Sequence, residues 1–345
     1  MDRWLGPRDK RKNTLNNSWG IPEYNSFGTD EFLEFCRQIG AQPQIALNLG
    51  SGTPEEAAAW VRYVDEHWAM HAGLLWELGN ELWGEWNLGY PTRDQLAART
   101  ADFSKAIHAV DSRARLIATG ADPDGFKSWN AIQLTNSPGT FDYLSTHFVV
   151  GTGEVQLKNP TPEFVAAAAF AMPVELEKRL HQAQSQIDGT PGYKEKAHLA
   201  FTEWLFIGEH HNAPSFANTG GAIVAGGFLN MLLKNSQIVP ISDMTGIMEF
   251  AGIWKKRGQV FATPTYYVFK LYANADISTR IGLHDFAGAR LATVHTLNSP
   301  SITDSNDEVS PTRVKPVDSE EAIQAEGWTH SFPHASVTVI SVHRD

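Results

Sequence analysis

Six short apolar runs alternate with helical segments along most of the chain, and this alternation constrains the fold more than any other feature. The runs are PQIALNLG (43–50), LLWELGN (74–80), RLIATG (115–120), FDYLSTHF (141–148), AHLAFTEWL (197–205) and IVPISDMTG (238–246). Most are apolar at first and end in polar residues or glycine, the pattern of strands buried on both faces of a parallel sheet. Strand–helix repetition of this kind indicates an α/β fold, either a (β/α)₈ barrel or a doubly wound sheet.

Helix-start signals occupy the intervals between these runs. Capping boxes begin at Thr53 and Thr92, and the first is followed by a proline at the first helical position. Thr161 opens a further helix, which we expect Pro173 to interrupt before a second helical run to about residue 187. The sequence also predicts a helix from Thr29 to Gly40 and a buried helix near 220–235.

The polar residues at the ends of the six runs favour the barrel. They are Asn48, Asn80, Glu81, Asp122, His147, Glu203 and Asp243. Catalytic residues of (β/α)₈ enzymes lie at the carboxyl ends of the strands, and a ring gathers them around one mouth. The chain has no GxGxxG or GxxxxGK[ST] loop, which weakens the nucleotide-binding alternative. A closed barrel needs eight strands, so we predict a (β/α)₈ TIM-type barrel, incomplete at its N-terminus, with six visible strands.

The pattern changes after about residue 275. RLATVHTL (290–297) and ASVTVISV (335–342) alternate like half-exposed strands, and a polar stretch at 298–326 separates them. We expect that stretch to be a loose loop. The sequence therefore predicts a catalytic barrel domain at 1–275 and a small antiparallel, β-sandwich-like domain at 276–345.

The segment LLWELGNELWGEW (74–86) has two interpretations. Its three glutamates, Glu77, Glu81 and Glu85, are four residues apart and would share one face of a helix. Gly79 and Asn80 are unfavourable in a helix interior, so a strand that ends near Asn80 is favoured. Glu81 then lies at the mouth of the barrel, whereas Glu77 is structural.

A second glutamate, Glu203, ends a similar strand. Two carboxyl groups on different strand ends suggest glycoside hydrolysis, in which one protonates the leaving oxygen and the other attacks the anomeric carbon if they are about 5–5.5 Å apart. The apolar neighbour Trp83 could raise the pKa of the acid, and Asn80 could orient the sugar 2-hydroxyl. The alternative for Glu203 is a buried structural glutamate paired with an arginine.

Several segments together resemble glycoside hydrolase family 51, the α-L-arabinofuranosidases. They are GPRD, FGTDEFLEFCRQIGAQPQIALNLGSGTPEEAAAWVRY, LGNELWGEWNLG, LAFTEWL and FPHASVTVISV. The resemblance implies a retaining (β/α)₈ hydrolase that releases α-L-arabinofuranosyl residues from plant polysaccharides or oligosaccharides. By position, Glu81 would be the general acid/base and Glu203 the nucleophile, and Asn80 would bind the 2-hydroxyl. His147 matches a histidine at the end of the family's sixth strand.

The predicted substrate-binding set is completed by Asn48, Trp83, Trp204 and Asp243. The chain departs from the family pattern at three pocket positions, where Val149, Ile207 and Asp243 replace a tyrosine, a tryptophan and a glutamine. Family members also have about two further strands before GPRD. These departures leave open an endo-β-glucanase or xylanase of the same clan, or a truncated inactive sugar-binding homologue.

Composition excludes other classes of function. The net charge is −11, and we interpret the one dense basic cluster, at residues 8–12, as a solvated loop, which argues against nucleic acid as a partner. No apolar run approaches the roughly 20 residues that span a bilayer, and no signal peptide is recognised, so we expect a cytoplasmic protein without membrane contact. We expect neither a metal nor a cofactor, since HExxH is absent. The expected partner is an arabinose-containing oligosaccharide or polysaccharide, and the resemblance also implies a homo-oligomer.

Overall fold

The structure is a computed structural model. It describes residues 5–17, 19–68, 74–121, 126–151, 160–207, 213–247, 251–274, 290–323, 328, 330–333 and 335–342. The chain divides into two compact units. Unit 1 comprises residues 1–147, 179–201 and 237–241, and unit 2 comprises residues 148–178, 202–236 and 242–345.

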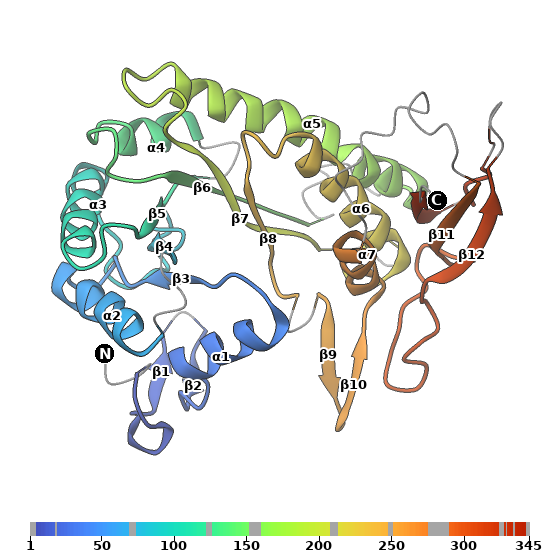
Figure 1. The fold of residues 1–345 in the computed structure, drawn as a ribbon, viewed down its shortest axis with the longest axis horizontal. Coiled ribbons are helices and arrows are strands. Elements are labelled where there is room, and N and C mark those ends of the chain that lie inside the picture. The colour runs from blue at the N-terminus through green and yellow to red at the C-terminus, as the bar shows by residue number, and fades with distance from the viewer. Residues whose placement is uncertain are drawn as a thin grey trace. The chain divides into compact units, whose positions relative to one another are not determined.

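Six strands form one sheet in the order β3-β4-β5-β6-β7-β8 (Figure 1). Their bounds are β3 Gln44–Leu47, β4 Leu75–Leu78, β5 Arg115–Ala118, β6 Tyr143–Gly151, β7 His198–Ile207 and β8 Ile241–Met244. The sheet is parallel, with Leu78 of β4 opposite both Leu47 and Ala118. All six predicted strands are confirmed, and together with the alternating helices they form a partial (β/α)₈ barrel.

Four helices of unit 1 connect the first strands. They are α1 Thr29–Ile39, α2 Pro54–His67, α3 Arg93–His108 and α4 Phe126–Gln133. The predicted helix starts are confirmed: Thr53 Oγ1 accepts a hydrogen bond from Glu56 N at 3.2 Å, and Thr92 begins α3 with a capping box. Helix α1 ends at Gly40, whose φ of 70° is the left-handed conformation that glycine adopts without a Cβ penalty.

Strand β4 lies entirely within the core of unit 1. All four of its residues are buried, and Leu75 packs with Ile117, Tyr143 and Ala200. Glu77 is 5% exposed and accepts a hydrogen bond from Gln44 Nε2 at 3.3 Å. The strand interpretation of residues 74–80 is confirmed, and Glu77 is a buried residue of that strand.

Helix α5, Pro162–Asp188, is continuous through Pro173, so the predicted interruption is wrong. Proline removes its own N–H from the helix, and its ring needs room beside the preceding turn. Helix α6, Thr219–Lys234, packs against this ring, since a Cβ on Gly227 would lie 3.1 Å from Pro173 Cγ. The proline ring thus meets a residue that has no side chain.

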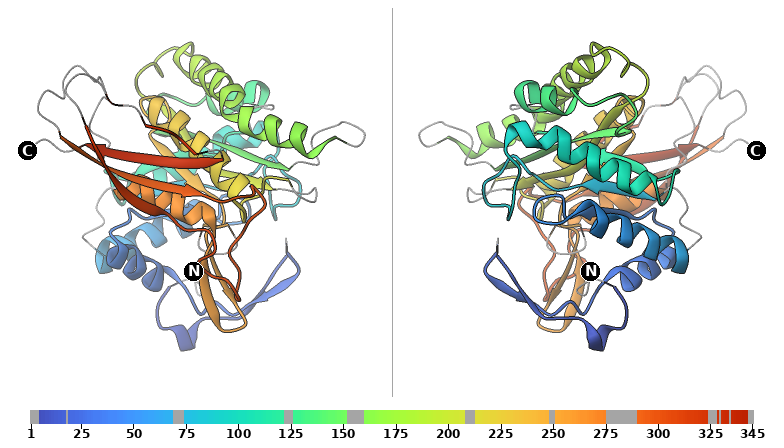
Figure 2. Two further views of the ribbon diagram at one scale, coloured as in Figure 1. Left: turned by 90° about the vertical axis from the view of Figure 1, so that its right-hand side faces the viewer. Right: turned by 90° about the vertical axis from the view of Figure 1, so that its left-hand side faces the viewer.

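A three-stranded antiparallel sheet follows near the C-terminus, with β11 between β12 and β13 (Figure 2). The strands are β11 Leu291–Asn298, β12 Val317–Ala322 and β13 Ser336–Val342, so both strands predicted in this region are confirmed. The smaller elements are a 3₁₀ turn η1 Arg8–Lys10, hairpins β1 Thr14–Asn16 with β2 Ile21–Glu23 and β9 Ile253–Lys256 with β10 Gln259–Ala262, and α7 Pro264–Asn274. The predicted domain boundary at residue 275 falls at the start of 275–289, outside the described residues, and stays a prediction.

The polar stretch expected to be a loose loop is ordered over its described part, residues 298–323. It contains β12, and Asn306 anchors the segment before that strand. This side chain is 6% exposed and donates from Nδ2 to the backbone oxygens of Ala262 and Val314 at 2.7 and 2.8 Å. Its Oδ1 accepts from Val314 N at 2.7 Å. The expectation was wrong because the buried Asn306 carboxamide hydrogen-bonds to backbone groups of this segment, and a polar composition does not reveal such bonds.

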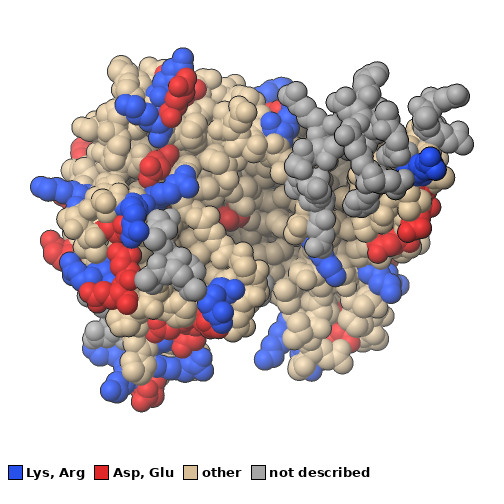
Figure 3. All heavy atoms as spheres, in the orientation of Figure 1, with Lys and Arg blue, Asp and Glu red and all other residues tan. Residues whose placement is uncertain are grey.

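The surface gives two further observations. Within the described residues, no helix combines the length and the apolar character that crossing a bilayer requires. On the face drawn in Figure 3, basic and acidic side chains of the described residues are interspersed rather than gathered by sign.

Candidate active site

Glu81 occupies a sharp turn directly after β4. Its φ is 46°, in the left-handed region that residues with a Cβ rarely adopt, and Gly79 two residues earlier has a φ of 85°. Such a conformation costs roughly 1–3 kcal/mol, is maintained only by surrounding structure, and is concentrated at functional sites. The chain therefore turns out of the sheet at the residue that the sequence predicts to be the acid/base.

Main-chain hydrogen bonds and buried packing hold this turn. The carbonyl oxygen of Glu81 accepts from Asn87 Nδ2 at 2.7 Å and from Gly84 N at 2.8 Å. Leu82 is 3% exposed and fills the space beside Gly79. The backbone around Glu81 is thus fixed on both sides of its strained torsion angle.

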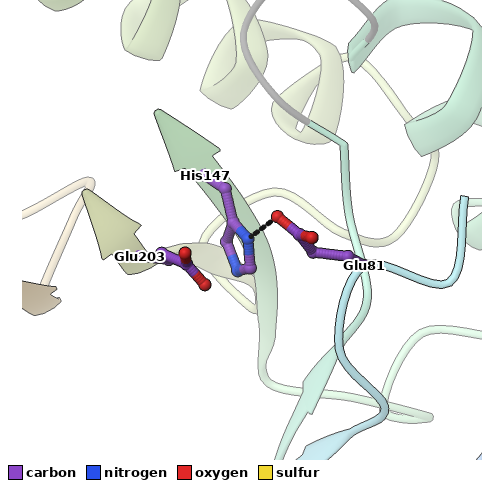
Figure 4. A group of neighbouring side chains, drawn as sticks. All are labelled: Glu81, His147 and Glu203. Atoms are coloured by element: carbon purple, nitrogen blue, oxygen red, sulfur yellow. Dashed lines mark hydrogen bonds and ion pairs between the residues drawn. The ribbon is translucent and has the colours of Figure 1, made fainter. Parts of the chain in front are cut away.

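The Glu81 carboxyl group meets His147, which lies on β6. Glu81 Oε1 and His147 Nδ1 are 2.9 Å apart, and Figure 4 marks this bond. The histidine side chain is 7% exposed and the glutamate side chain 21%. When the carboxylate is ionised, Nδ1–H donates to it; when the carboxyl group is protonated, its O–H donates to Nδ1. The pair can therefore hold Glu81 in one position in both protonation states.

Asn48 and Asn80 lie together in unit 1. Both line a cavity of about 370 Å³ at the ends of β3 and β4, along with Trp60, Asn87 and Leu88. The Asn80 side chain is exposed. The Asn48 carboxamide closes its own loop instead, since Oδ1 accepts from Ser51 N and Nδ2 donates to Ser51 Oγ, both at 3.0 Å. Of the two, Asn80 is the better placed to contact a ligand.

The two tryptophans of the predicted set have different environments. Trp83 is half-buried, with its ring edge-on to Trp86 at a centroid distance of 5.2 Å. Trp204 is only 2% exposed; its ring stacks on Phe228 at 5.2 Å, and its Nε1 donates to Ser242 Oγ at 2.9 Å. A ring enclosed in this way has no free face for a sugar. The prediction that Trp204 binds substrate is therefore corrected to a packing role in unit 2.

Glu203 and Asp243 belong to unit 2. Glu203 extends from β7 and is half-buried (Figure 4). Asp243 lies on β8 and keeps access to solvent, but nearby protein displaces enough hydration to raise the pKa of its carboxyl group to about 6. A carboxyl group with this pKa changes its charge near neutral pH.

Comparison with known proteins points to one family. Residues 2–69 match the family described as the α-L-arabinofuranosidase 1 domain. α-L-Arabinofuranosidase C of Emericella nidulans is 26% identical over 302 residues, which cover 78% of this chain and 58% of that protein. By these matches the chain is similar to the α-L-arabinofuranosidases of glycoside hydrolase family 51.

Two further comparisons delimit what is shared. An intracellular exo-α-(1→5)-L-arabinofuranosidase of Halalkalibacterium halodurans is 28% identical over 224 residues, 58% of this chain and 42% of that protein. The arabinose complex of the Thermotoga maritima α-L-arabinofuranosidase superposes with a TM-score of 0.81 at 24% identity, covering 98% of this chain and 83% of that one. The structural match shows the fold, and this chain spans about half the length of the curated relatives it matches.

Proposed function

We propose that this chain releases α-L-arabinofuranosyl residues from plant oligosaccharides or polysaccharides with retention of configuration. The observation that carries the proposal is the Glu81–His147 pair: a carboxyl group in a strained turn at the carboxyl end of β4, hydrogen-bonded to a nearly buried imidazole on β6. The names of the relatives, all α-L-arabinofuranosidases among those compared, support the sugar. The intracellular relative supports a cytoplasmic location.

Glu203, on β7 of unit 2, is proposed as the nucleophile that acts together with Glu81. Chain continuity supports this assignment, because β7 begins beside β6 in unit 1, where His198 N donates to Asp142 O at 3.1 Å. Glu203 follows Phe201, the last residue of that unit on β7, by two positions. The carboxyl ends of parallel strands face the same mouth of a barrel, where catalytic groups gather.

The proposed reaction has two displacements. The Glu203 carboxylate forms a bond to the anomeric carbon while Glu81 gives its proton to the departing oxygen, which yields a glycosyl ester and a free alcohol. Glu81, now a carboxylate, then removes a proton from water as that water attacks the same carbon, and the ester bond to Glu203 breaks. His147 holds the Glu81 carboxyl group through both steps, and Asn80 binds the sugar 2-hydroxyl.

Kinetics of glutamate variants test the proposal. We expect Glu81→Gln to lower kcat on an aryl α-L-arabinofuranoside by roughly 10²–10⁴-fold, the range for positioned acid–base groups. Glu203→Gln removes the nucleophile and should lower kcat at least as much. Azide should restore turnover of Glu81→Gln, because this anion attacks the glycosyl ester without giving up a proton. Glu85→Gln, in the exposed part of the loop, is the matched control and should retain activity.

Three results would contradict the proposal. Wild-type turnover of an aryl β-glucoside or β-xyloside, but not of the arabinofuranoside, would assign the chain to a glucanase or xylanase. If NMR shows that the first-formed sugar has inverted configuration, a covalent intermediate is excluded. Equal activity of Glu203→Gln and wild type would remove Glu203 from the mechanism.

A further inference from the structure

We propose that Asn87 is a positioning residue that holds Glu81 in the conformation required for proton transfer; this rests on the role of Glu81 proposed above. The side chain of Asn87 donates from Nδ2 to the main-chain oxygen of Glu81 at 2.7 Å. It does not contact the Glu81 carboxyl group through any hydrogen bond found among the described residues. Asn87 therefore acts on the backbone that carries the catalytic side chain.

The need for such a residue follows from the backbone of Glu81. With a φ of 46°, Glu81 is in a conformation from which a residue with a Cβ relaxes unless other contacts prevent it. Relaxation to negative φ rotates the Cα–Cβ bond and carries the carboxyl group away from His147 Nδ1, now 2.9 Å distant. A bond to the Glu81 carbonyl oxygen opposes that rotation directly.

Asn87 is itself fixed by the loop. Its N donates to Gly84 O at 3.1 Å, and its carbonyl oxygen accepts from Tyr90 N at 3.2 Å. The Trp86 ring covers Gly84 so closely that a Cβ there would clash with the indole. Because both backbone groups of Asn87 are engaged, its carboxamide is presented to Glu81 from a rigid support rather than from a mobile side chain.

Asn87 also lines the 370 Å³ cavity that contains Asn80. A direct contact between Asn87 and a bound sugar would affect mainly KM, because such binding stabilises ground state and transition state alike. A positioning role would lower kcat/KM mainly for a substrate whose leaving group needs the proton from Glu81. The kinetic constants therefore distinguish the two roles.

The experiment compares Asn87→Asp with wild type on two arabinofuranosides, one with a 4-nitrophenyl leaving group and one with an alkyl leaving group. Aspartate keeps the shape of asparagine but, when ionised, has no N–H to donate. We expect kcat/KM on the alkyl substrate to fall roughly tenfold, since slight misplacement of a catalytic group already costs large factors. On the nitrophenyl substrate, which departs without a proton, kcat/KM should fall no more than about twofold, because this constant reports cleavage of the glycosidic bond and not the later attack of water.

Two further variants make the result decisive. Asn136→Asp is the matched control, because Asn136 is also half-buried and its side chain bonds only weakly, to Gln133 Oε1 at 3.4 Å. It should leave both rates unchanged. Asn87→Ala removes the donor without adding charge; it should reproduce the leaving-group dependence and covers the case in which Asn87→Asp fails to fold, as judged by circular dichroism.

Failure of this inference differs from failure of the proposed function. If Glu81→Gln shows strong leaving-group dependence and both Asn87 variants lose equal activity on the two substrates, or change KM alone, the positioning role is refuted. If Glu81→Gln itself shows no dependence on the leaving group, Glu81 is not the acid and the proposed function fails first.

Discussion

Replacement of Gly79 by alanine tests whether the turn before Glu81 is held by packing as well as by hydrogen bonds. At a φ of 85° the added methyl group meets the left-handed penalty of about 1–2 kcal/mol. It would also lie 2.6 Å from Cδ1 and 2.9 Å from Cγ of Leu82, which is 3% exposed and has little freedom to withdraw. Overpacking of this kind costs about 1–3 kcal/mol, and reduced entropy of the unfolded chain returns about 0.4–1 kcal/mol. We therefore expect a loss of about 3 kcal/mol in the free energy of unfolding.

Gly139→Ala provides the matched control. Gly139 has a φ of 94°, but a Cβ built there has nothing within 4 Å. Gly139→Ala should incur the torsional penalty alone, which lowers the free energy of unfolding by about 1 kcal/mol. Urea denaturation monitored by tryptophan fluorescence measures both values, and the difference of about 2 kcal/mol belongs to the contact with Leu82.

A double-mutant cycle checks this assignment. In a Leu82→Ala background the clash is removed, so the cost of Gly79→Ala should fall to that of Gly139→Ala. If Gly79→Ala is no more destabilising than Gly139→Ala in the wild-type background, the turn is not fixed by Leu82. The reasoning would also be wrong if the cycle shows no coupling between the two positions.

Two further predictions concern unit 2. Asp243→Asn should raise the free energy of unfolding at pH 7. The pKa of the Asp243 carboxyl group is about 6 in the folded protein, above its usual value of 3.8. The wild-type stability is therefore fully present below pH 3.8 and is lost as the pH rises through 6. Denaturation at several pH values should show the advantage of the asparagine variant shrinking to zero near pH 4, and an advantage independent of pH would contradict it. Asn306→Ala should cost about 2–3 kcal/mol in thermal or urea unfolding, because it leaves the buried N–H of Val314 without its acceptor. Asn136→Ala, with its single long side-chain bond, should cost far less.

The sequence was sufficient to locate the six strands and most of the helices. Apolar runs with polar ends reflect burial on two faces, and this property is local to each segment. Thr53 and Thr92 mark helix starts for a similarly local reason, because each cap satisfies N–H groups within its own first turn. The position of Glu81 was predicted with the help of Gly79. Glycine is unfavourable inside a helix, so the four-residue spacing of the glutamates was not taken as a helical pattern.

The features that the sequence did not predict depend on distant partners. Pro173 lies inside a helix, and its ring packs against Gly227, 54 positions later. Trp204 was included in the predicted substrate-binding set, but its ring stacks on Phe228 and its Nε1 donates to Ser242 Oγ. Asn87 gave no separate signal, since an asparagine in a glycine-rich loop usually serves its own turn. Each of these roles is decided by a neighbour that periodicity does not reveal.

The contrast between Glu77 and Glu81 shows how one residue type acquires two roles within a single turn. Glu77 lies in β4, where the regular strand keeps it 5% exposed and bonded to Gln44. Four residues later, positive φ angles at Gly79 and Glu81 have reversed the chain, and the second carboxyl group faces an imidazole on a strand that is not its immediate neighbour. The chemistry proposed for Glu81 therefore requires a stable turn as well as the carboxyl group itself. Variants that relax the turn should lose activity while every proposed catalytic side chain is still present.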